Sequence, residues 1–412
     1  MSIQTCDILI SGGGIAGLSA TAAFGTAGFS VICVDPTPPI TDREAVGADM
    51  RSTAMLQPAR DVLMAAGIWD HLASHAAPLQ IMRIVEAGGE KPEARIIKDF
   101  NAADISDLPF GWNFPNYVLR REMLARLDAL PNVDFRPGTG TTSLFTRSQM
   151  ATVTLSDGIK IQTKLVIAAD GRDSPMRQAA GIDVTPKRYG QKALAFAVTH
   201  PIPHENVSTE IHRTGGPFTL VPLPDFNGLP CSAVVWMDDA AKSLARMDLD
   251  TTAFEEEMSV RSCYHFGPLT LASKRSIWPI ISQTASALSG QRIALIAEAA
   301  HVVPPIGAQG LNMSLRDMGA LLELAAARPD GLGDAEMLMA YEKARMGDIK
   351  LRVRGIDLLN RASQASSPAF RDARALGLNA LYNLGPVRKT LMQMGLGVAG
   401  KQGKGYPNTK TK

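Results

Sequence analysis

A glycine motif near the amino terminus constrains the fold of this chain most strongly. Gly12, Gly14 and Gly17 follow the spacing G-x-G-x-x-G, between the apolar run 8–10 and the alanine-rich stretch 18–27. This order predicts a strand, a tight turn and a helix. Gly12 would allow the turn, Gly14 would let a pyrophosphate approach the backbone, and Gly17 would let the helix pack closely on the strand.

A second strand and an acidic residue extend this unit. The apolar run 30–34 ends in Asp35, about 20 residues after the motif, where a dinucleotide-binding fold places an acceptor for ribose hydroxyl groups. A carboxylate there favours an unphosphorylated adenosine ribose, as in FAD or NAD. The alternative is a glycine-rich turn that binds nothing. Because a helix start offers free N–H groups to phosphates, we predict a dinucleotide site that comprises Gly12, Gly14, Ile15, Ala16, Gly17 and Asp35.

Two later segments distinguish FAD from NAD. The apolar run 165–169 ends in Asp170-Gly171, and the segment 292–300, whose core 293–297 is apolar, leads through His301 into the loop 304–312. Both segments resemble motifs of the flavin-dependent aromatic hydroxylases. The resemblance implies that FAD binds here and that NAD(P)H supplies electrons. It also implies that the flavin contacts include Asp170, Gly171, Glu298, Gly307, Gly310, Leu311 and Asn312.

Within this superfamily, the chain resembles the hydroxylases of ubiquinone biosynthesis over most of its length. Residues 307–317 resemble their flavin loop and the helix after it, and residues 216–223 and 234–236 resemble their substrate-domain strands. Arg51 and Arg120 stand at the positions of two FAD-contacting arginines. The resemblance implies a hydrophobic, polyprenylated phenol as substrate, which molecular oxygen hydroxylates through a flavin hydroperoxide.

The resemblance also implies roles within the flavin loop. Pro304 and Pro305 would lie beside the flavin ring, on the side where substrate enters. Residues 309–312 lie just before an expected helix, so their N–H groups can face the flavin's pyrimidine oxygen and stabilise negative charge on the reduced ring. We therefore take Pro304, Pro305 and Gln309 as catalytic candidates. His301 follows a strand end and is expected to shape the flavin pocket rather than to act as a base.

The chain departs from the family at one pair of residues. Where the family usually has Gly-Asp, with the carboxylate on a ribityl hydroxyl, this chain has Ala297-Glu298. The extra methylene extends the carboxylate by roughly 1.5 Å, and Ala297 tolerates a positive φ poorly. Glu298 therefore either reaches the ribityl chain after a local adjustment or points away from it.

The order of the motifs predicts an α/β fold with three parts. A Rossmann-like FAD-binding domain would be discontinuous, from residues 1–185 and 285–345, because its glycine motif and its flavin loop are far apart in sequence. An inserted antiparallel β-sheet domain for the substrate would occupy 186–284, and a C-terminal helical region and tail would occupy 346–412. We expect strands at 193–198, 218–222 and 232–236, a hairpin at 157–158 and a helix at 313–327.

Composition narrows the partners and the compartment. The 412 residues are 45% hydrophobic and carry a formal charge of +2, so no nucleic-acid partner is implied. The four cysteines lack C-x-x-C spacing, which suits reduced thiols in a reducing compartment. The histidines at 200, 204 and 212 match no zinc pattern, so we expect no metal. Without a secretory leader or an apolar span of about 18 residues, we expect a cytoplasmic protein, with peripheral docking at the inner face of the membrane as an option.

The segment 350–392 mixes basic and apolar residues. We hypothesise that it docks on an anionic membrane surface or on a partner in a biosynthetic complex. The alternative is an amphipathic helix pair that packs on the flavin domain.

Three functions of the whole chain stay open: the ubiquinone-pathway hydroxylase, another flavoenzyme of this fold (a hydroxylase of a small phenolic, a prenyl reductase or a halogenase), and a non-catalytic flavoprotein. The four tryptophans are isolated, which argues against the Trp-x-Trp pair of halogenases.

Overall fold

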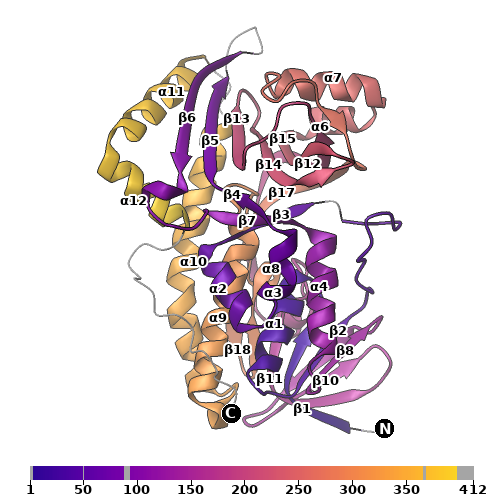
Figure 1. Ribbon diagram of the computed structural model, residues 1–412. Helices are drawn as coiled ribbons and strands as arrows, with labels where there is room; N and C mark the ends of the chain where they lie inside the picture. Colours follow the sequence, from indigo (N-terminus) through magenta and orange to yellow (C-terminus); the bar gives the residue numbers. More distant parts are fainter. Residues whose placement is uncertain (1–2, 50, 88–92, 365–367, 397–412) are drawn as a thin grey trace.

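The computed structural model describes residues 3–49, 51–87, 93–364 and 368–396. Two β-sheets form the body of the molecule, the first in the lower half of Figure 1 and the second in the upper half. A long helix, α10, runs beside both of them. The α/β fold with a helical C-terminal region confirms the predicted fold class.

The first sheet has the order β18-β19-β11-β1-β2-β8. Within it, the consecutive strands β19, β11, β1, β2 and β8 all run parallel to one another. Ile8, Leu9 and Ile10 on the central strand are fully buried, as a strand covered on both faces requires. The hairpin predicted at 157–158 joins two antiparallel strands, β10 and β11. The strands are β1 (Ile3–Ser11), β2 (Val31–Asp35), β8 (Val133–Pro137), β9 (Thr141–Thr146), β10 (Ala151–Leu155), β11 (Lys160–Ala168), β18 (Ser289–Gly290) and β19 (Ile293–Leu295).

The second sheet has the order β20-β17-β12-β15-β14-β13-β5-β6, with β16 beside β12. The strands predicted at 193–198, 218–222 and 232–236 lie within β12, β14 and β15. Its pairs are antiparallel except β13 with β5, which is parallel. The strands are β5 (Ile81–Ala87), β6 (Ala94–Asn101), β12 (Val184–Thr199), β13 (Val207–His212), β14 (Pro217–Phe226), β15 (Leu229–Asp239), β16 (Thr270–Leu271), β17 (Ser276–Ala285) and β20 (His301–Val302).

Strand pairing adds residues 81–101 to this second sheet, although the predicted substrate domain spans only 186–284. The physical reason is that β5 pairs with β13, more than 100 residues later in the chain, and no local pattern encodes that choice. The exact domain boundaries remain a proposal, and we propose that 81–101 belongs with the substrate-binding sheet.

A small third sheet joins the two large ones. It consists of β3 (Ser52–Leu56), β7 (Gly111–Pro115) and β4 (Ala77–Leu79), in the order β3-β7-β4. The Asn113 side chain on β7 donates a hydrogen bond to the carbonyl of Pro222 on β14 at 2.9 Å. The third sheet is therefore fixed to the second sheet, and it carries β3 toward the flavin loop.

Helices cover the sheets. The α-helices are α1 (Ile15–Thr26), α2 (Gln57–Ala65), α3 (Trp69–Leu72), α4 (Asn116–Asp128), α5 (Pro175–Ala179), α6 (Ala240–Met247), α7 (Thr251–Arg261), α8 (Ala297–Ala300), α9 (Gln309–Ala327), α10 (Ala335–Gln364), α11 (Pro368–Asn383) and α12 (Gly385–Leu396). Short 3-10 turns lie at Ala73–His75, Ala102–Asp104 and Pro329–Gly331. Within the described ranges, no helix has both the length and the apolar character needed to cross a membrane.

Helix α10 connects the two large sheets. Its first half packs beside α9, and its second half reaches the bulged part of β12. There Asp357 accepts hydrogen bonds from Lys187 and from the Tyr189 hydroxyl, the latter at 2.8 Å. The Asn360 side chain donates to Gln191 at 3.1 Å. These polar contacts hold the second sheet in place relative to the flavin loop.

Candidate functional site

Three glycines shape the loop between β1 and α1. Gly12 has φ +107°, and a Cβ at this position would lie 2.3 Å from the carbonyl oxygen of Ala169. A Cβ at Gly17 would lie 1.8 Å from the carbonyl oxygen of Gly12, so the helix could not pack this closely with any side chain there. A Cβ at Gly14 would meet no protein atom within 4 Å. The approach to the start of α1 is therefore open at Gly14, as the pyrophosphate prediction requires.

Asp35 braces the same loop from the end of β2. Its carboxylate accepts hydrogen bonds from the backbone N–H of Gly13 at 2.6 Å and from that of Thr37 at 2.7 Å. The carboxylate thus lies directly beside the glycine loop. This is the place at which an acceptor for adenosine ribose hydroxyls is needed, so its predicted role as a ribose contact stays a proposal that the geometry allows.

Asp170 has one carboxylate oxygen without a partner. Its Oδ2 accepts from the N–H of Met176 at 3.1 Å and from the Ser11 hydroxyl at 3.3 Å, while its buried Oδ1 accepts no hydrogen bond from any described residue. Burial raises the pKa of Asp170. A buried acceptor without a donor costs about 1–3 kcal/mol. A hydroxyl group of a ribityl chain would supply the missing donor. The next residue, Gly171, has φ +86°, an angle that favours glycine.

Asp49 gathers the two predicted arginines. Its carboxylate pairs with Arg51 at 2.8 Å and with Arg120 at 3.1 Å, and it accepts from the Asn116 amide at 2.8 Å. Burial opposes the ionisation of Asp49, but these hydrogen bonds and charges outweigh it and lower its pKa to about 2. Sequence reasoning gave Asp49 no role. The only hint of this role in the sequence is that Asp49 lies two residues before Arg51.

The flavin loop ends four residues earlier than predicted. Helix α9 begins at Gln309 rather than at Met313, because Gly307 and Ala308 both take left-handed backbone angles, with φ +62° and +54°. Residues 309–312 are therefore the first turn of the helix itself. The N–H groups of a first turn have no intrahelical acceptors, so they can serve the predicted flavin oxygen directly. Pro304 is buried and Pro305 is exposed.

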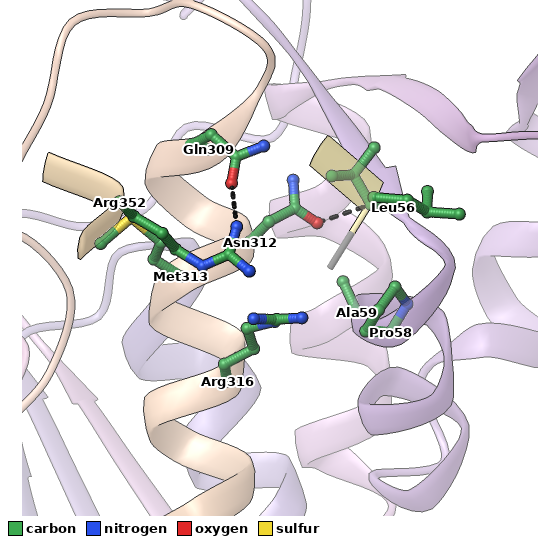
Figure 2. A pocket seen from close by; sticks show the side chains of 9 residues that line it. Leu56, Pro58, Ala59, Gln309, Asn312, Met313, Arg316 and Arg352 are labelled. Carbon is green, nitrogen blue, oxygen red and sulfur yellow. Dashed lines mark hydrogen bonds between the residues drawn. The ribbon is translucent and has the colours of Figure 1, made fainter. Parts of the chain in front are cut away.

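Asn312 ties this first turn to β3. Its side-chain oxygen accepts from the N–H of Leu56 at 2.8 Å, and its amide donates to the carbonyl of Ala54 at 2.7 Å. Figure 2 shows this contact beside a small pocket. The pocket has a volume of about 10 Å³, enough for one water molecule and far too small for an aromatic substrate. The Asn312 side chain therefore positions the loop, and the free N–H groups of residues 309–311 are left for the cofactor.

The unusual pair Ala297-Glu298 has a defined geometry. Ala297 has φ +56°, a left-handed angle that suits the glycine of the family pattern. Glu298 is half exposed, and its carboxylate lies 3.7 Å from the guanidinium of Arg172. Of the two alternatives drawn from the sequence, the structure shows the carboxylate directed to this surface arginine. A ribityl contact by Glu298 stays a proposal.

His301 is buried and paired. Its Nε2 lies 2.6 Å from Oδ2 of Asp317, and Oδ1 of the same carboxylate accepts from Arg345 at 2.8 Å. The His301 and Asp317 side chains have no exposed surface. This arrangement agrees with the expected pocket-shaping role. Sequence reasoning gave Asp317 and Arg345 no role, because the three paired residues come from separate elements, β20, α9 and α10.

These features together fit a flavin dinucleotide. The loop at Gly14 is open to phosphates, Asp170 lacks one donor at a buried oxygen, and the first turn of α9 offers N–H groups to a negatively charged ring. Leu311 and Gly310 lie in that same turn. A cofactor with a pyrophosphate, a chain of hydroxyls and an electron-accepting ring would use all three.

Comparison with known proteins agrees with this geometry. The family model described as the FAD binding domain matches residues 5–353. The chain belongs to this family. Its cofactor is FAD, it is an FAD-dependent aromatic-ring monooxygenase, and NAD(P)H is the usual electron donor of such enzymes. The recognition of the ubiquinone-biosynthesis hydroxylases from sequence motifs is confirmed.

Two relatives and one solved structure illustrate the likeness. The ubiquinone hydroxylase UbiL of Rhodospirillum rubrum is 30% identical, over 96% of this chain and 90% of the relative. The 3-demethoxyubiquinol 3-hydroxylase of Escherichia coli is 27% identical, over 97% of this chain and all of the relative. The p-nitrophenol 4-monooxygenase PnpA of Pseudomonas putida shares the fold, with a TM-score of 0.78 at 18% identity, over 96% of this chain and 99% of that chain.

Proposed function

We propose that this monooxygenase hydroxylates an aromatic ring of a polyprenylated phenol in ubiquinone biosynthesis, with molecular oxygen and NAD(P)H. The observation that carries this proposal is the 30% identity to a ubiquinone hydroxylase over nearly the full length of both chains. The site supports it, because Gly12, Asp35 and Asp170 lie at the carboxyl ends of β1, β2 and β11, which are neighbours in the first sheet.

Each group of residues would have its own role in the reaction. Bound FAD activates oxygen for transfer to an electron-rich ring. The free N–H groups at the start of α9, from Gln309 to Leu311, would stabilise negative charge on the reduced flavin. Pro304 and Pro305 would form the wall against which the substrate ring lies. Asp170 would orient the ribityl chain through its unpartnered oxygen.

Complementation with product analysis tests this proposal. The gene would be expressed in a bacterial strain that lacks its own ubiquinone hydroxylases, and the quinone intermediates would be identified by mass spectrometry. We expect loss of the accumulated precursor and appearance of a product with one more ring oxygen. The matched control is Gly14→Val, which should bind no FAD and leave the precursor unchanged. A holoenzyme with normal flavin and rapid NAD(P)H oxidation on small phenols, but no effect on the precursor, would instead favour the hydroxylase of a small phenolic.

We further propose that the C-terminal helices dock on an anionic membrane surface. Between residues 350 and 396 the sequence has eight basic and two acidic residues, a net charge of +6. Arg354, Arg361 and Lys389 are exposed in this segment. The side chains of Arg371 and Arg374 lie outside the described residues. Large apolar side chains are exposed beside them, namely Leu351, Leu358, Leu359, Leu376, Leu381, Leu384, Val387, Leu391 and Met394.

This exposure favours docking over the alternative of internal packing. An amphipathic helix pair that packs on the flavin domain would bury its leucines, yet Leu358 and Leu376 are 69% and 71% exposed. A polyprenylated substrate partitions into membranes, since each buried methylene contributes about 0.8 kcal/mol. A basic, apolar surface is complementary to anionic lipid.

Cosedimentation with liposomes tests the docking. We expect the protein to pellet with vesicles that contain phosphatidylglycerol at low salt, and to be released at high salt. The variant Arg354→Gln/Arg361→Gln/Lys389→Gln should bind less, whereas Lys242→Gln/Lys274→Gln, which removes exposed charge from the second sheet's side, should bind as the wild type does. Wild-type protein that stays in the supernatant at low salt would contradict membrane docking.

A further inference from the structure

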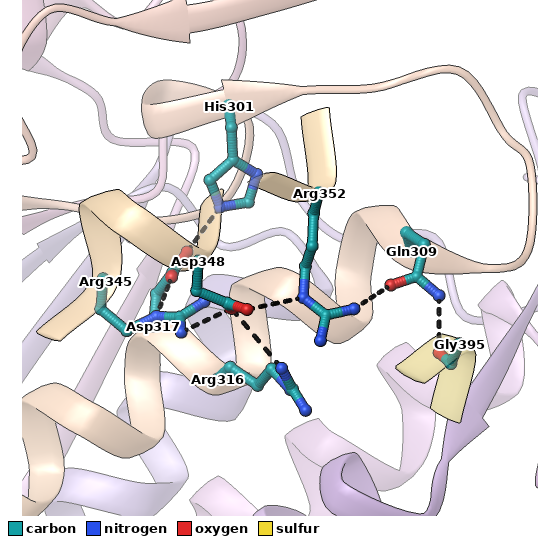
Figure 3. A network of polar contacts seen from close by, with 8 residues as sticks. All are labelled: His301, Gln309, Arg316, Asp317, Arg345, Asp348, Arg352 and Gly395. Atoms are coloured by element: carbon teal, nitrogen blue, oxygen red, sulfur yellow. Dashed lines mark hydrogen bonds and ion pairs between the residues drawn. The ribbon is translucent and has the colours of Figure 1, made fainter. Parts of the chain in front are cut away.

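The two ends of the flavin loop are joined by a chain of polar contacts. The loop leaves β20 just after His301 and enters α9 at Gln309. Between these ends, ion pairs and hydrogen bonds run through α9 and α10, as Figure 3 shows. We call this set the polar bridge, and its members are His301, Asp317, Arg345, Asp348, Arg352 and Gln309.

The contacts of the polar bridge are continuous. From the buried His301–Asp317–Arg345 group, Arg345 donates to Asp348 at 2.8 Å. Asp348 also accepts from Nε of Arg352 at 3.0 Å, and Arg352 donates from Nη1 to the side-chain oxygen of Gln309 at 2.9 Å. Burial raises the pKa of Asp348, but Arg345 and Arg352 outweigh it, so the net shift is downward. Asp348 is therefore charged at neutral pH and joins the two arginines.

Three members of the bridge lie on one face of α10. Residues 345, 348 and 352 are three and four positions apart, the spacing that aligns side chains on a helix. The Arg345 and Arg352 side chains are only 8% and 16% exposed, so solvent weakens these contacts less than it would on an open surface. The geometry at Gln309 is thus set by a rigid helix rather than by a loop.

The flavin loop needs such support. Ala308, which immediately precedes Gln309, has φ +54°, and a left-handed residue with a Cβ costs roughly 1–2 kcal/mol. Backbone of this kind persists only where its surroundings hold it. The Gln309 amide is held on both sides, because it accepts from Arg352 and also donates to the carbonyl of Gly395 on α12 at 3.2 Å.

We propose that Arg352 is a positioning residue for the flavin loop. It holds the Gln309 side chain and thereby fixes the first turn of α9, whose free N–H groups would serve the bound flavin. Arg352 itself acts through Gln309 and needs no contact with cofactor or substrate. The proposal is independent of which ring is hydroxylated, because FAD binding alone reports on it.

Titration of the apoprotein with FAD tests this role. We expect Arg352→Met to raise the Kd for FAD about tenfold, the size expected for one lost hydrogen bond to a charged group. The matched control is Lys343→Met, because Lys343 is an exposed cation on the same helix, outside the docking segment 350–396. It should leave the Kd unchanged. An unchanged Kd in Arg352→Met would overturn the proposal.

A double-mutant cycle shows whether Arg352 acts through Gln309. Gln309→Met should weaken FAD to a similar extent, and Arg352→Met/Gln309→Met should be no worse than either single variant. Effects that simply add would overturn the positioning role. Hydrogen exchange of the Arg352→Met apoprotein distinguishes a local change at the flavin loop from a general loss of folding. Exchange should rise at residues 309–312 and stay unchanged in β1, whereas a rise throughout the protein would assign Arg352 a merely structural role and overturn the proposal.

Discussion

Alanine at two glycines of one loop should affect two different properties: FAD affinity at Gly14 and the free energy of unfolding at Gly17. Gly14 has an extended backbone, φ −68° and ψ 176°, and a Cβ there meets no protein atom within 4 Å. Alanine at Gly14 should therefore leave the folded apoprotein almost as stable as the wild type. The gain from a less flexible unfolded chain, about 0.4–1 kcal/mol, is offset by the loss of a glycine at the start of α1, a similar amount.

Cofactor affinity should respond quite differently to Gly14→Ala. The added methyl group occupies the open approach through which the pyrophosphate reaches the backbone. Overpacking of a close contact costs about 1–3 kcal/mol, which corresponds to a rise of roughly 5- to 150-fold in the Kd for FAD. The larger Gly14→Val should abolish binding.

At Gly17 the cost falls on folding instead. A Cβ there would lie 1.8 Å from the carbonyl oxygen of Gly12, and this neighbour is backbone, which cannot rotate away. We expect Gly17→Ala to lose about 3 kcal/mol or more of the free energy of unfolding. Urea unfolding of both apoproteins and FAD titration of the folded ones make the comparison. Normal FAD affinity in Gly14→Ala would refute the assignment of the loop, and normal stability in Gly17→Ala would refute the close packing.

Three further predictions concern carboxylates of the site. Glu298→Gln should change the Kd for FAD by less than about threefold, because the carboxylate is half exposed and pairs with Arg172; a tenfold weaker affinity would place Glu298 on the ribityl chain instead. FAD should bind more tightly as pH rises toward the pKa of Asp170 in the apoprotein and become independent of pH above it. The reason is that burial raises this pKa, while a hydroxyl donated to Oδ1 favours the charged carboxylate and lowers it in the complex. Asp170→Asn should remove this pH dependence, and a dependence that persists in the variant would assign it to another group. Asp317→Asn should lower the free energy of unfolding by about 1.5–3 kcal/mol, since it removes the carboxylate that the buried Arg345 and His301 share and leaves Arg345 only Asp348 as a charged partner; a urea denaturation curve that shifts by less than 1 kcal/mol would contradict this.

Local patterns predicted the first unit of the fold well. The apolar run 8–10, the glycines and the alanine-rich stretch all act within a few residues of one another, so β1, the turn at Gly12 and α1 follow from sequence. The start of α9 did not follow, because the left-handed angle at Ala308 is unusual for alanine and no propensity announces it. The place of β5 and β6 in the second sheet also could not be predicted, since it depends on a pairing with β13 across more than 100 residues.

In the candidate site, too, local backbone features could be predicted from the sequence, whereas contacts between distant elements could not. Gly12 and Gly17 are backbone constraints that the glycine motif predicts from sequence, whereas the left-handed angle at Ala297 was left open by the sequence and is seen only in the structure. The partners of the polar side chains come from distant elements, as when Asp317 on α9 meets Arg345 on α10. Such pairs require the packed helices to exist first. The resemblance to a family therefore identified the cofactor as FAD, while the contacts that support the flavin loop became visible only in three dimensions.

Transfer of labelled oxygen tests the central claim most directly. The FAD-loaded enzyme would be reduced with NAD(P)H and mixed with ¹⁸O₂ and a short-chain polyprenylated phenol, and the product would be analysed by mass spectrometry. We expect one labelled oxygen atom on the aromatic ring of the product, and none with Gly14→Val protein. Hydrogen peroxide with no ring-labelled product, from an enzyme fully loaded with FAD and substrate, would contradict the assignment of this chain as a hydroxylase of such phenols.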